Sequence, residues 1–145
     1  MKKTLFIILI MFFCIMIVLF VALRNAQGLE RDTQKFNLEF EQYTNKNIYG
    51  TEIATMINKA VNNNEKYRIE KDENGFYIED DSYSIKIDIY IKINETTYAM
   101  ETIYKLGTEQ FVQNFNSIKF HTTNVEYHNK TGRIAKIVLE QVEEE

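Results

Sequence analysis

The chain of 145 residues has no proline and no tryptophan, and its single cysteine is Cys14. One cysteine excludes an intramolecular disulfide bond, so the fold must be stabilised by its own core. Cys14 lies inside an apolar run, far from any base that would activate its thiol. We interpret the missing proline and tryptophan, beside many isoleucines, lysines and asparagines, as the coding bias of an AT-rich genome.

The common catalytic and nucleotide-binding motifs are also missing. The sequence contains no serine-centred nucleophile elbow, no glycine-rich phosphate loop and no CxxC pair. Adjacent carboxylates occur at residues 79–81 and 143–145. Carboxylate pairs perform glycosidic chemistry in some enzymes, but neighbouring acids in turns and tails are usually only solvated. No cofactor is implied, and we expect a non-enzymatic protein.

Basic residues are scarce beyond the N-terminus. Of the 17 basic residues, Lys2, Lys3 and Arg24 lie in or beside the apolar run, which leaves 14 against 21 acidic residues and a balance of −7. Neutralisation of phosphates by lysine and arginine supplies most of the affinity for nucleic acids. The sequence therefore excludes nucleic acid as an expected partner.

Residues 4–23 form a run of twenty amino acids without a charged side chain. A helix of this length spans about 30 Å, which matches the hydrocarbon core of a bilayer, and it satisfies its own backbone hydrogen bonds in lipid. The sequence therefore predicts a transmembrane anchor over residues 1–27, with the lipid bilayer contacted through residues 4–23, and an extracytoplasmic domain over residues 28–145. The anchor side chains that we single out are Leu5, Phe6, Ile10, Phe13, Ile17 and Phe20.

The flanks of the run bear on its orientation. A short basic tail followed at once by an apolar stretch is the plan of a secretory signal. This plan predicts a single-pass protein of the cell membrane, with its N-terminus in the cytoplasm and its C-terminal domain outside. Small residues at Ala26 and Gly28 leave an alternative, in which a signal peptidase cleaves after Gly28 and the domain is secreted. The apolar core exceeds the usual ~7–15 residues of a signal peptide, which favours the uncleaved anchor.

The domain is predicted to begin with two helices. Apolar residues recur at helical spacing over residues 29–43, and Gly28 is a candidate break between that helix and the anchor. A second amphipathic helix is predicted over residues 52–62, with Thr51 as its N-cap and the asparagines at 62–64 as its end.

After these helices the apolar period changes to two, which indicates strands. The clearest strand is residues 84–93, in which five alternate isoleucines face one way. Further strands are predicted over residues 67–69, 76–79, 96–104, 118–127 and 133–142, with a short helix after Gly107. The sequence therefore predicts an α+β fold, in which an N-terminal transmembrane helix is followed by helices packed on one face of an antiparallel β-sheet.

One segment follows the spacing of a calcium-binding loop. Oxygen-bearing side chains stand at Glu70, Asp72, Asn74 and Asp81, with Gly75 at the position of the sharp turn. The first residue is Glu where the loop has Asp, the last is Asp where it has a bidentate Glu, and the flanks read as strands. The pattern favours a hairpin turn with solvated acids, and a calcium site is the alternative.

Three other polar side chains are candidate site residues. His121 and His128 are seven residues apart, so on one strand they point to opposite faces about 23 Å apart. This spacing excludes a shared metal ion, and both histidines are expected at the surface. Tyr90 lies on the polar face of the strand at residues 84–93, where it is a candidate for a contact surface.

Two parts of the domain resemble a known group of proteins. FNLEFEQY followed by YGTEIATMINKAVNNN, within residues 36–64, and NVEYHNKTGRI, residues 124–134, are similar to small, uncharacterised single-pass envelope proteins of low-GC Gram-positive bacteria. The resemblance covers about a third of the domain. It implies a bacterial cell-envelope protein, and no functional residue is transferred with it.

These observations predict an interaction or assembly module of the cell envelope, with a protein as its partner. The plan of an apolar N-terminal helix, an amphipathic extension and a sheet is shared with pilin-like subunits, although the prepilin cleavage pattern is missing. The alternative is a small-ligand- or calcium-binding ectodomain.

Overall fold

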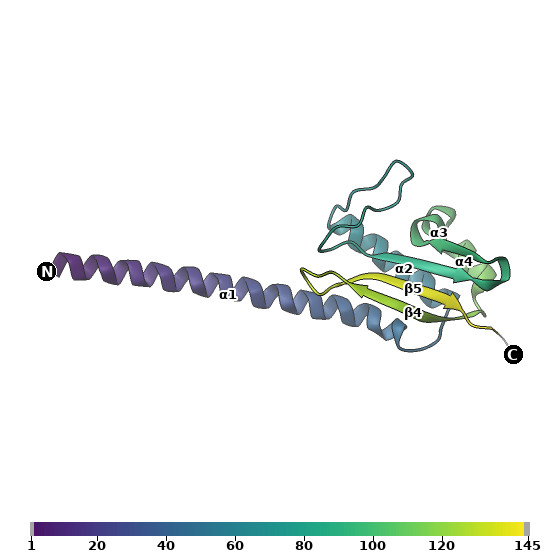
Figure 1. Cartoon of the computed structure of the whole chain (residues 1–145), viewed down its shortest axis with the longest axis horizontal. Helices are drawn as coiled ribbons and strands as arrows, with labels where there is room; N and C mark the ends of the chain where they lie inside the picture. The colour runs from purple at the N-terminus through teal and green to yellow at the C-terminus, as the bar shows by residue number, and fades with distance from the viewer. Residues whose placement is uncertain (1, 144–145) are drawn as a thin grey trace. The chain divides into compact units, whose positions relative to one another are not determined.

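A computed structural model describes residues 2–143 of the chain, with the side chains of Lys2 and Leu5 left aside. The fold is α+β (Figure 1). The chain divides into two compact units, Met1–Lys35 and Phe36–Glu145. The predicted boundary between residues 27 and 28 stays a prediction.

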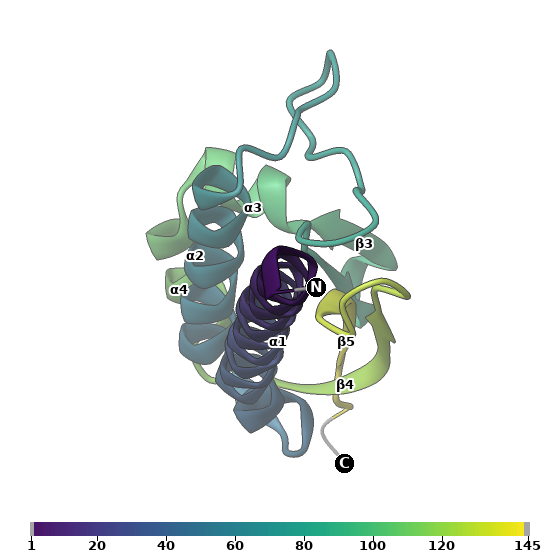
Figure 2. The ribbon, with the colours of Figure 1, turned by 90° about the vertical axis from the view of Figure 1, so that its left-hand side faces the viewer.

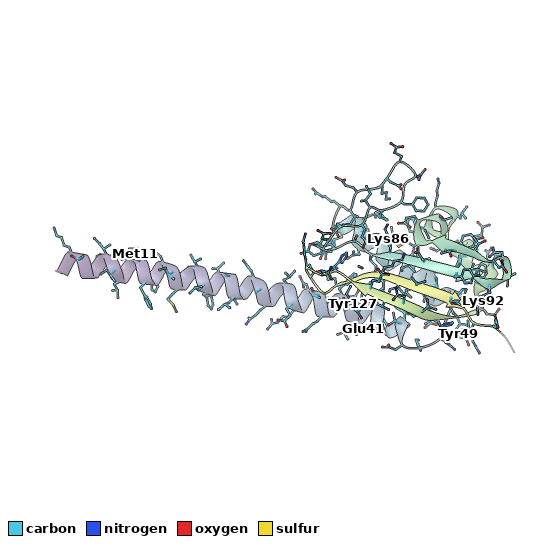
Figure 3. All side chains as sticks on the ribbon, viewed as in Figure 1. Met11, Glu41, Tyr49, Lys86, Lys92 and Tyr127 are labelled. Atoms are coloured by element: carbon cyan, nitrogen blue, oxygen red, sulfur yellow. The ribbon has the colours of Figure 1, made fainter. Side chains whose placement is uncertain are left out.

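Residues 2–35 of the first unit belong to α1 (Lys2–Thr44), a single helix that includes the predicted helix at residues 29–43. Gly28 is helical, so the candidate break there is not present. In the N-terminal part of α1, large apolar side chains such as Met11 project outward (Figure 3). The anchor residues Phe6, Ile10, Phe13, Ile17 and Phe20 are all at least 48% exposed, whereas the side chain of Leu5 lies outside the described ones.

This helix is long and apolar enough to cross a membrane, with a mean hydropathy of 3.4 over its most apolar stretch. Exposed apolar surface on this scale is unfavourable in water. The helix therefore has the properties of a transmembrane anchor or of a signal sequence.

The second unit contains a five-stranded sheet in the order β1-β4-β5-β2-β3. Its strands are β1 (Ile48–Tyr49), β2 (Lys86–Ile91), β3 (Thr96–Ala99), β4 (Lys119–Tyr127) and β5 (Ile134–Gln141). The sheet is mixed, not antiparallel as expected: β2 and β5 run parallel, with Ile87 beside Ile137, while the other neighbours are antiparallel. A parallel pair needs a long crossover, which the helices and β4 between β3 and β5 provide.

Besides residues 36–44 of α1, this unit contains the helices α2 (Gly50–Lys66), α3 (Met100–Leu106) and α4 (Thr108–Phe115). Figure 2 shows α2 and α4 next to one another. One cluster of buried residues joins α2 to the sheet, and Ile57, Ile87 and Ile137 in it are fully buried. Burial of each such side chain contributes about 1.5–3 kcal/mol.

The alternation predicted for residues 84–93 is confirmed over most of its length. Ile85, Ile87, Ile89 and Ile91 are buried, and the residues between them on β2 are half-buried. Ile93 is an exception at 76% exposed, because the chain leaves the strand after Ile91 and forms the 3₁₀ turn η1 (Lys92–Asn94).

Two of the predicted strands are wrong. Residues 67–69 and 76–79 form no strand. Within residues 67–79, one antiparallel β-bridge pairs Lys71 with Tyr77. A hairpin that pairs with no third strand has little to stabilise a regular ladder. The strand predicted over residues 96–104 ends at Ala99, and the chain continues as α3.

The ends of α2 also differ from the expectation. The helix begins at Gly50, so Thr51 lies inside it, and the Glu52 carboxylate accepts a hydrogen bond from the Tyr49 N–H at 3.0 Å. The asparagines at 62–64 lie within the helix rather than ending it. Tertiary hydrogen bonds outweigh their poor helix propensity.

Asn64 is fully buried and pairs with the backbone of Ile85. Its Nδ2 donates to the Ile85 carbonyl at 2.9 Å, and its Oδ1 accepts from the Ile85 N–H at 2.9 Å. Next to it, Asn63 donates to the Tyr83 carbonyl at 2.7 Å. These two asparagines join the end of α2 to the residues that lead into β2.

Arg133 connects the end of α1 that belongs to this unit with α2. Its side chain is buried, its guanidinium carbon lies 3.8 Å from the centroid of the Phe36 ring, and its Nη2 donates to Asn63 Oδ1 at 2.9 Å. Beside it, Asn37 donates to the Gly132 carbonyl and accepts from the Ile134 N–H. Residues 36–44 are thereby held to the start of β5 by specific polar contacts.

Candidate functional site

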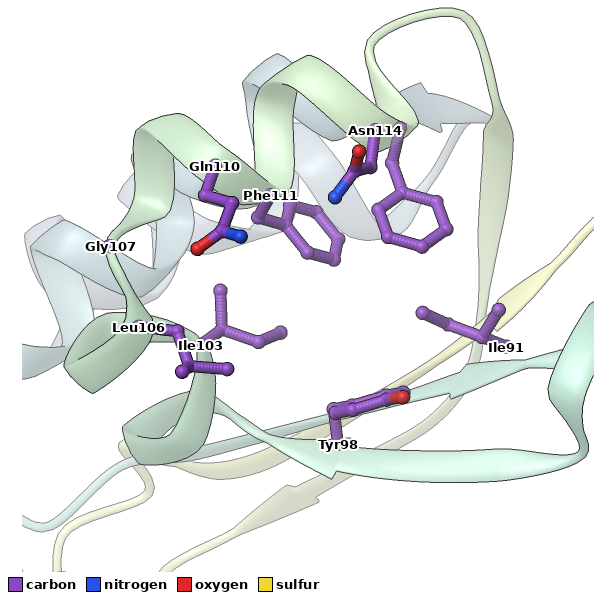
Figure 4. A pocket seen from close by; sticks show the side chains of 9 residues that line it. Ile91, Tyr98, Ile103, Leu106, Gly107, Gln110, Phe111 and Asn114 are labelled. Carbon is purple, nitrogen blue, oxygen red and sulfur yellow. The ribbon is translucent and has the colours of Figure 1, made fainter.

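A cleft of about 250 Å³ opens between α3, α4 and the β2–β3 hairpin (Figure 4). Most of its lining is apolar or aromatic. The side chains and backbone that line it belong to Ile91, Tyr98, Ile103, Leu106, Gly107, Gln110, Phe111, Asn114 and Phe115. These described residues carry no charge, which favours binding of an uncharged group over acid-base chemistry.

The local sequence explains how the cleft forms. Gly107 joins α3 to α4 with a φ of +101°, a conformation that side-chain-bearing residues rarely adopt. Phe111 and Phe115 are four residues apart on α4, so they share one face, and their ring centroids lie 4.8 Å apart. Opposite Phe111, Tyr98 of β3 presents its ring from the sheet (Figure 4).

Two carboxamides, Gln110 and Asn114, are the polar side chains on the α4 side of the cleft (Figure 4). On the sheet side, the Tyr98 hydroxyl accepts a hydrogen bond from Asn94 Nδ2 at 2.9 Å. A carboxamide both donates and accepts hydrogen bonds. The cleft therefore offers an apolar interior with neutral polar groups beside it.

The polar face of the sheet is a second surface of interest. Tyr90 lies there half-buried, level with Thr97 on β3 and Glu140 on β5. Charged neighbours form ion pairs here: Lys136 of β5 with Asp88 of β2 at 2.8 Å, and Lys92 at the start of η1 with Glu140 of β5 at 3.1 Å. The hydrogen bond that Lys136 donates to the Asp88 carboxylate raises the pKa of Lys136 above its usual value, and burial opposes that shift.

Two of the four calcium candidates, Asp72 and Asp81, have other partners in the domain. Asp72 Oδ1 accepts hydrogen bonds from the Asn74 and Phe76 N–H groups, and Asp81 pairs with Lys130 at 2.6 Å. Within residues 2–143, no three His, Cys, Asp or Glu side chains are arranged to hold a metal ion. Asp72 thus organises the turn at Gly75, and calcium binding by Glu70, Asp72, Asn74 and Asp81 stays a prediction.

The expectation that both histidines lie at the surface is wrong for His128, which is 5% exposed. Its Nε2 is 2.7 Å from the Ser84 carbonyl, and its backbone N–H donates to the Arg133 carbonyl. His121 is half-buried on β4. The contact between His128 and the Ser84 carbonyl could not be predicted from sequence spacing, because the two residues are 44 positions apart.

Asp80 organises the corner that precedes β2. Its Oδ1 accepts three backbone hydrogen bonds, from Ser82 at 3.0 Å and from Tyr83 and Ser84 at 2.7 Å each. Burial alone would raise the pKa of Asp80, but the N–H donors of Ser84, Tyr83 and Ser82 outweigh it and hold the pKa below its ordinary value. The ionised form of this carboxylate therefore stabilises the folded domain.

Acid is expected to remove this stabilisation. Because the folded pKa lies below the unfolded value of about 3.9, the contribution is complete above that unfolded value and is lost as the pH falls through the folded pKa. At neutral pH, Asp80→Asn is expected to lower the free energy of unfolding by about 1 kcal/mol, a figure reduced for partial exposure. Urea unfolding of the full-length protein in neutral detergent, at neutral pH and in steps below pH 4, measures the difference.

The matched control is Asp81→Asn, because its ion pair with Lys130 is exposed and is expected to contribute little. A deficit of the Asp80→Asn variant that stays constant down to the lowest pH would contradict the role of the Asp80 charge.

The cleft was not anticipated from the sequence. Residues 96–104 read as one strand, so α3 and its junction with α4 at Gly107 were not predicted. The one available signal was the spacing of Phe111 and Phe115, which marks an aromatic helix face. A comparison with known proteins finds no matching family model, no matching curated protein and no matching solved structure.

Proposed function

We propose that the chain is a single-pass protein of the bacterial cell membrane that displays its α+β domain outside the cytoplasm. Its N-terminus lies in the cytoplasm, and the domain acts as a non-enzymatic interaction or assembly module of the envelope. The observation that carries this proposal is the exposed apolar helix within residues 4–23. The resemblance of residues 36–64 and 124–134 to small envelope proteins supports the same placement.

The contact surface that we propose is the polar face of the sheet. In this proposal the helices cover the face that holds Ile87 and Ile137, and the buried cluster that these residues share with α2 supports that arrangement. The opposite face presents Tyr90 between charged pairs. Tyrosine combines apolar area with a hydrogen-bonding group, and it is enriched among the residues that dominate binding energies.

The test is recovery of a protein partner after cross-linking in intact cells. Tyr90→Ala in the full-length chain is expected to reduce recovery of the partner about tenfold or more, because truncation of a central tyrosine removes a large share of the binding energy. Quantitative mass spectrometry of the purified, cross-linked complex measures the recovery.

Tyr104→Ala is the matched control, since Tyr104 is 45% exposed but belongs to α3 and not to the sheet. Recovery of no specific partner with the wild-type chain would overturn the assembly role. Equal losses for the Tyr90 and Tyr104 variants would overturn the assignment of the surface.

A small-ligand-binding ectodomain is the second candidate function. The cleft between α3, α4 and β3 favours it, because ligand sites are mostly apolar concave surfaces with a few polar groups. In this alternative the anchor holds the domain at the membrane, and the cleft carries the function.

A further inference from the structure

We infer that the cleft between α3, α4 and β3 binds a small, uncharged, planar ring compound that carries one hydrogen-bonding group. This inference develops the small-ligand alternative and rests on neither the membrane placement nor the protein partner. It is carried by three features of the cleft, namely its volume, its aromatic walls and the chemistry of its polar groups.

The volume of the cleft sets the size of the ligand. A cavity of about 150 Å³ lined by apolar side chains accommodates benzene. The present cleft, at about 250 Å³, is larger than that and smaller than the ~300–1,000 Å³ of sites for drug-sized ligands. One ring or two fused rings therefore fit, whereas a nucleotide or an extended lipid chain is too large.

The walls of the cleft set the shape of the ligand. Phe111 and Phe115 of α4 line the cleft. Tyr98 lines it from the sheet side, opposite Phe111 (Figure 4). Aromatic rings stack on or meet the edges of other rings with a gain of about 0.5–1.5 kcal/mol beyond their buried area. A flat ring thus gains more between these walls than a branched aliphatic group of equal volume.

The polar groups set the charge of the ligand. Among the described residues, no lysine, arginine, aspartate or glutamate lines the cleft. A charged group would lose hydration here without gaining an ion pair. The carboxamides of Gln110 and Asn114 are able to accept a hydrogen bond from a ring N–H or hydroxyl, so one neutral polar group suits the site.

Indole is the probe, because it has two fused rings, no charge and one N–H donor. The full-length protein in neutral detergent is titrated with indole, and the methyl signals of Ile91, Ile103 and Leu106 are followed by NMR. We expect saturable shifts at these three residues, with a dissociation constant on the order of 1 mM or tighter. Indole that partitions into detergent gives no saturable shift at these methyl groups.

Two cleft variants, one control variant and a charged analogue make the test specific. Gln110 and Asn114 are both exposed, so Gln110→Phe and Asn114→Phe are expected to fill the cleft without unfolding the domain and to weaken indole binding at least tenfold. Gln113→Phe places the same ring on an exposed position of α4 outside the cleft lining, and its affinity is expected to stay unchanged. Indole-2-carboxylate is expected to bind at least tenfold more weakly than indole.

Absence of saturable shifts in the wild-type protein would overturn the inference, and so would equal affinities of the Gln110→Phe and Gln113→Phe variants. Tight binding of the carboxylate would overturn the assignment of an uncharged ligand. These results come from purified protein, whereas the proposed envelope role is tested in cells, so either proposal can fail without the other.

Discussion

A variant with Ile10→Arg, Phe13→Arg and Ile17→Arg is expected to leave the membrane fraction. These three side chains lie near the middle of the apolar stretch and are exposed, with Phe13 at 66%. An arginine at the centre of a spanning helix costs about 2.5–3.5 kcal/mol, so the three together oppose insertion by roughly 9 kcal/mol. That cost is comparable to the whole insertion free energy of an apolar run of this length.

Alkaline carbonate extraction of cell membranes measures the outcome. The wild-type chain is expected in the pellet and the arginine variant in the supernatant. The control carries leucine at the same three positions, which keeps the apolar character and is expected to stay in the pellet. A wild-type chain that remains soluble in the cytosol would refute the membrane placement.

Intact mass of the mature protein separates the two modes of export. A mass that includes residues 1–28 is expected for an uncleaved anchor. A mature protein that begins at Leu29 would instead establish the secreted alternative, with cleavage after Gly28.

Asn64→Ala is expected to destabilise the domain more than any exposed substitution. The change removes the partners of both the N–H and the carbonyl of Ile85, and both groups stay buried because Ile85 and Asn64 are fully buried. Each unsatisfied buried group costs about 1–3 kcal/mol, so we expect a loss of about 3 kcal/mol or more. The thermal midpoint should fall by about 10 °C for a unit of this size.

Asn62→Ala is the matched control. Asn62 precedes the pair in the same helix and is exposed, so its replacement is expected to change the free energy of unfolding by no more than about 0.5 kcal/mol. Chemical unfolding of both full-length variants in neutral detergent gives the comparison. Similar stabilities of the Asn62 and Asn64 variants would show that the Ile85 backbone finds other partners.

Elements with a strong and repeated apolar pattern were predictable. The alternating isoleucines of β2 and the apolar residues of β5 follow a period of two, and α2 follows the helical period. In each of them the residues that face the core are few, regular and apolar, so local spacing reports burial directly. The apolar run within residues 4–23 is the extreme case, because its length and composition suffice to predict a helix long and apolar enough to cross a membrane.

Elements that depend on distant partners were not predictable. Residues 100–104 read as strand, but they form α3, whose Met100 and Ile103 are buried. The asparagines at 63 and 64 read as a helix end, but their hydrogen bonds to residues 20 and 21 positions away keep them in the helix. Propensity yields to tertiary contacts of this kind.

The sequence alone therefore determined that one apolar helix precedes an acidic α+β domain whose core is built largely from isoleucine. It determined this because apolar period and charge are local properties that no later contact changes. Tertiary structure alone decided that β2 and β5 run parallel, that His128 and Arg133 are buried, and that α3, α4 and β3 enclose a cleft. Each of these features depends on contacts between residues far apart in the chain. The free energies of many such contacts compete, so no short sequence pattern predicts which of them form.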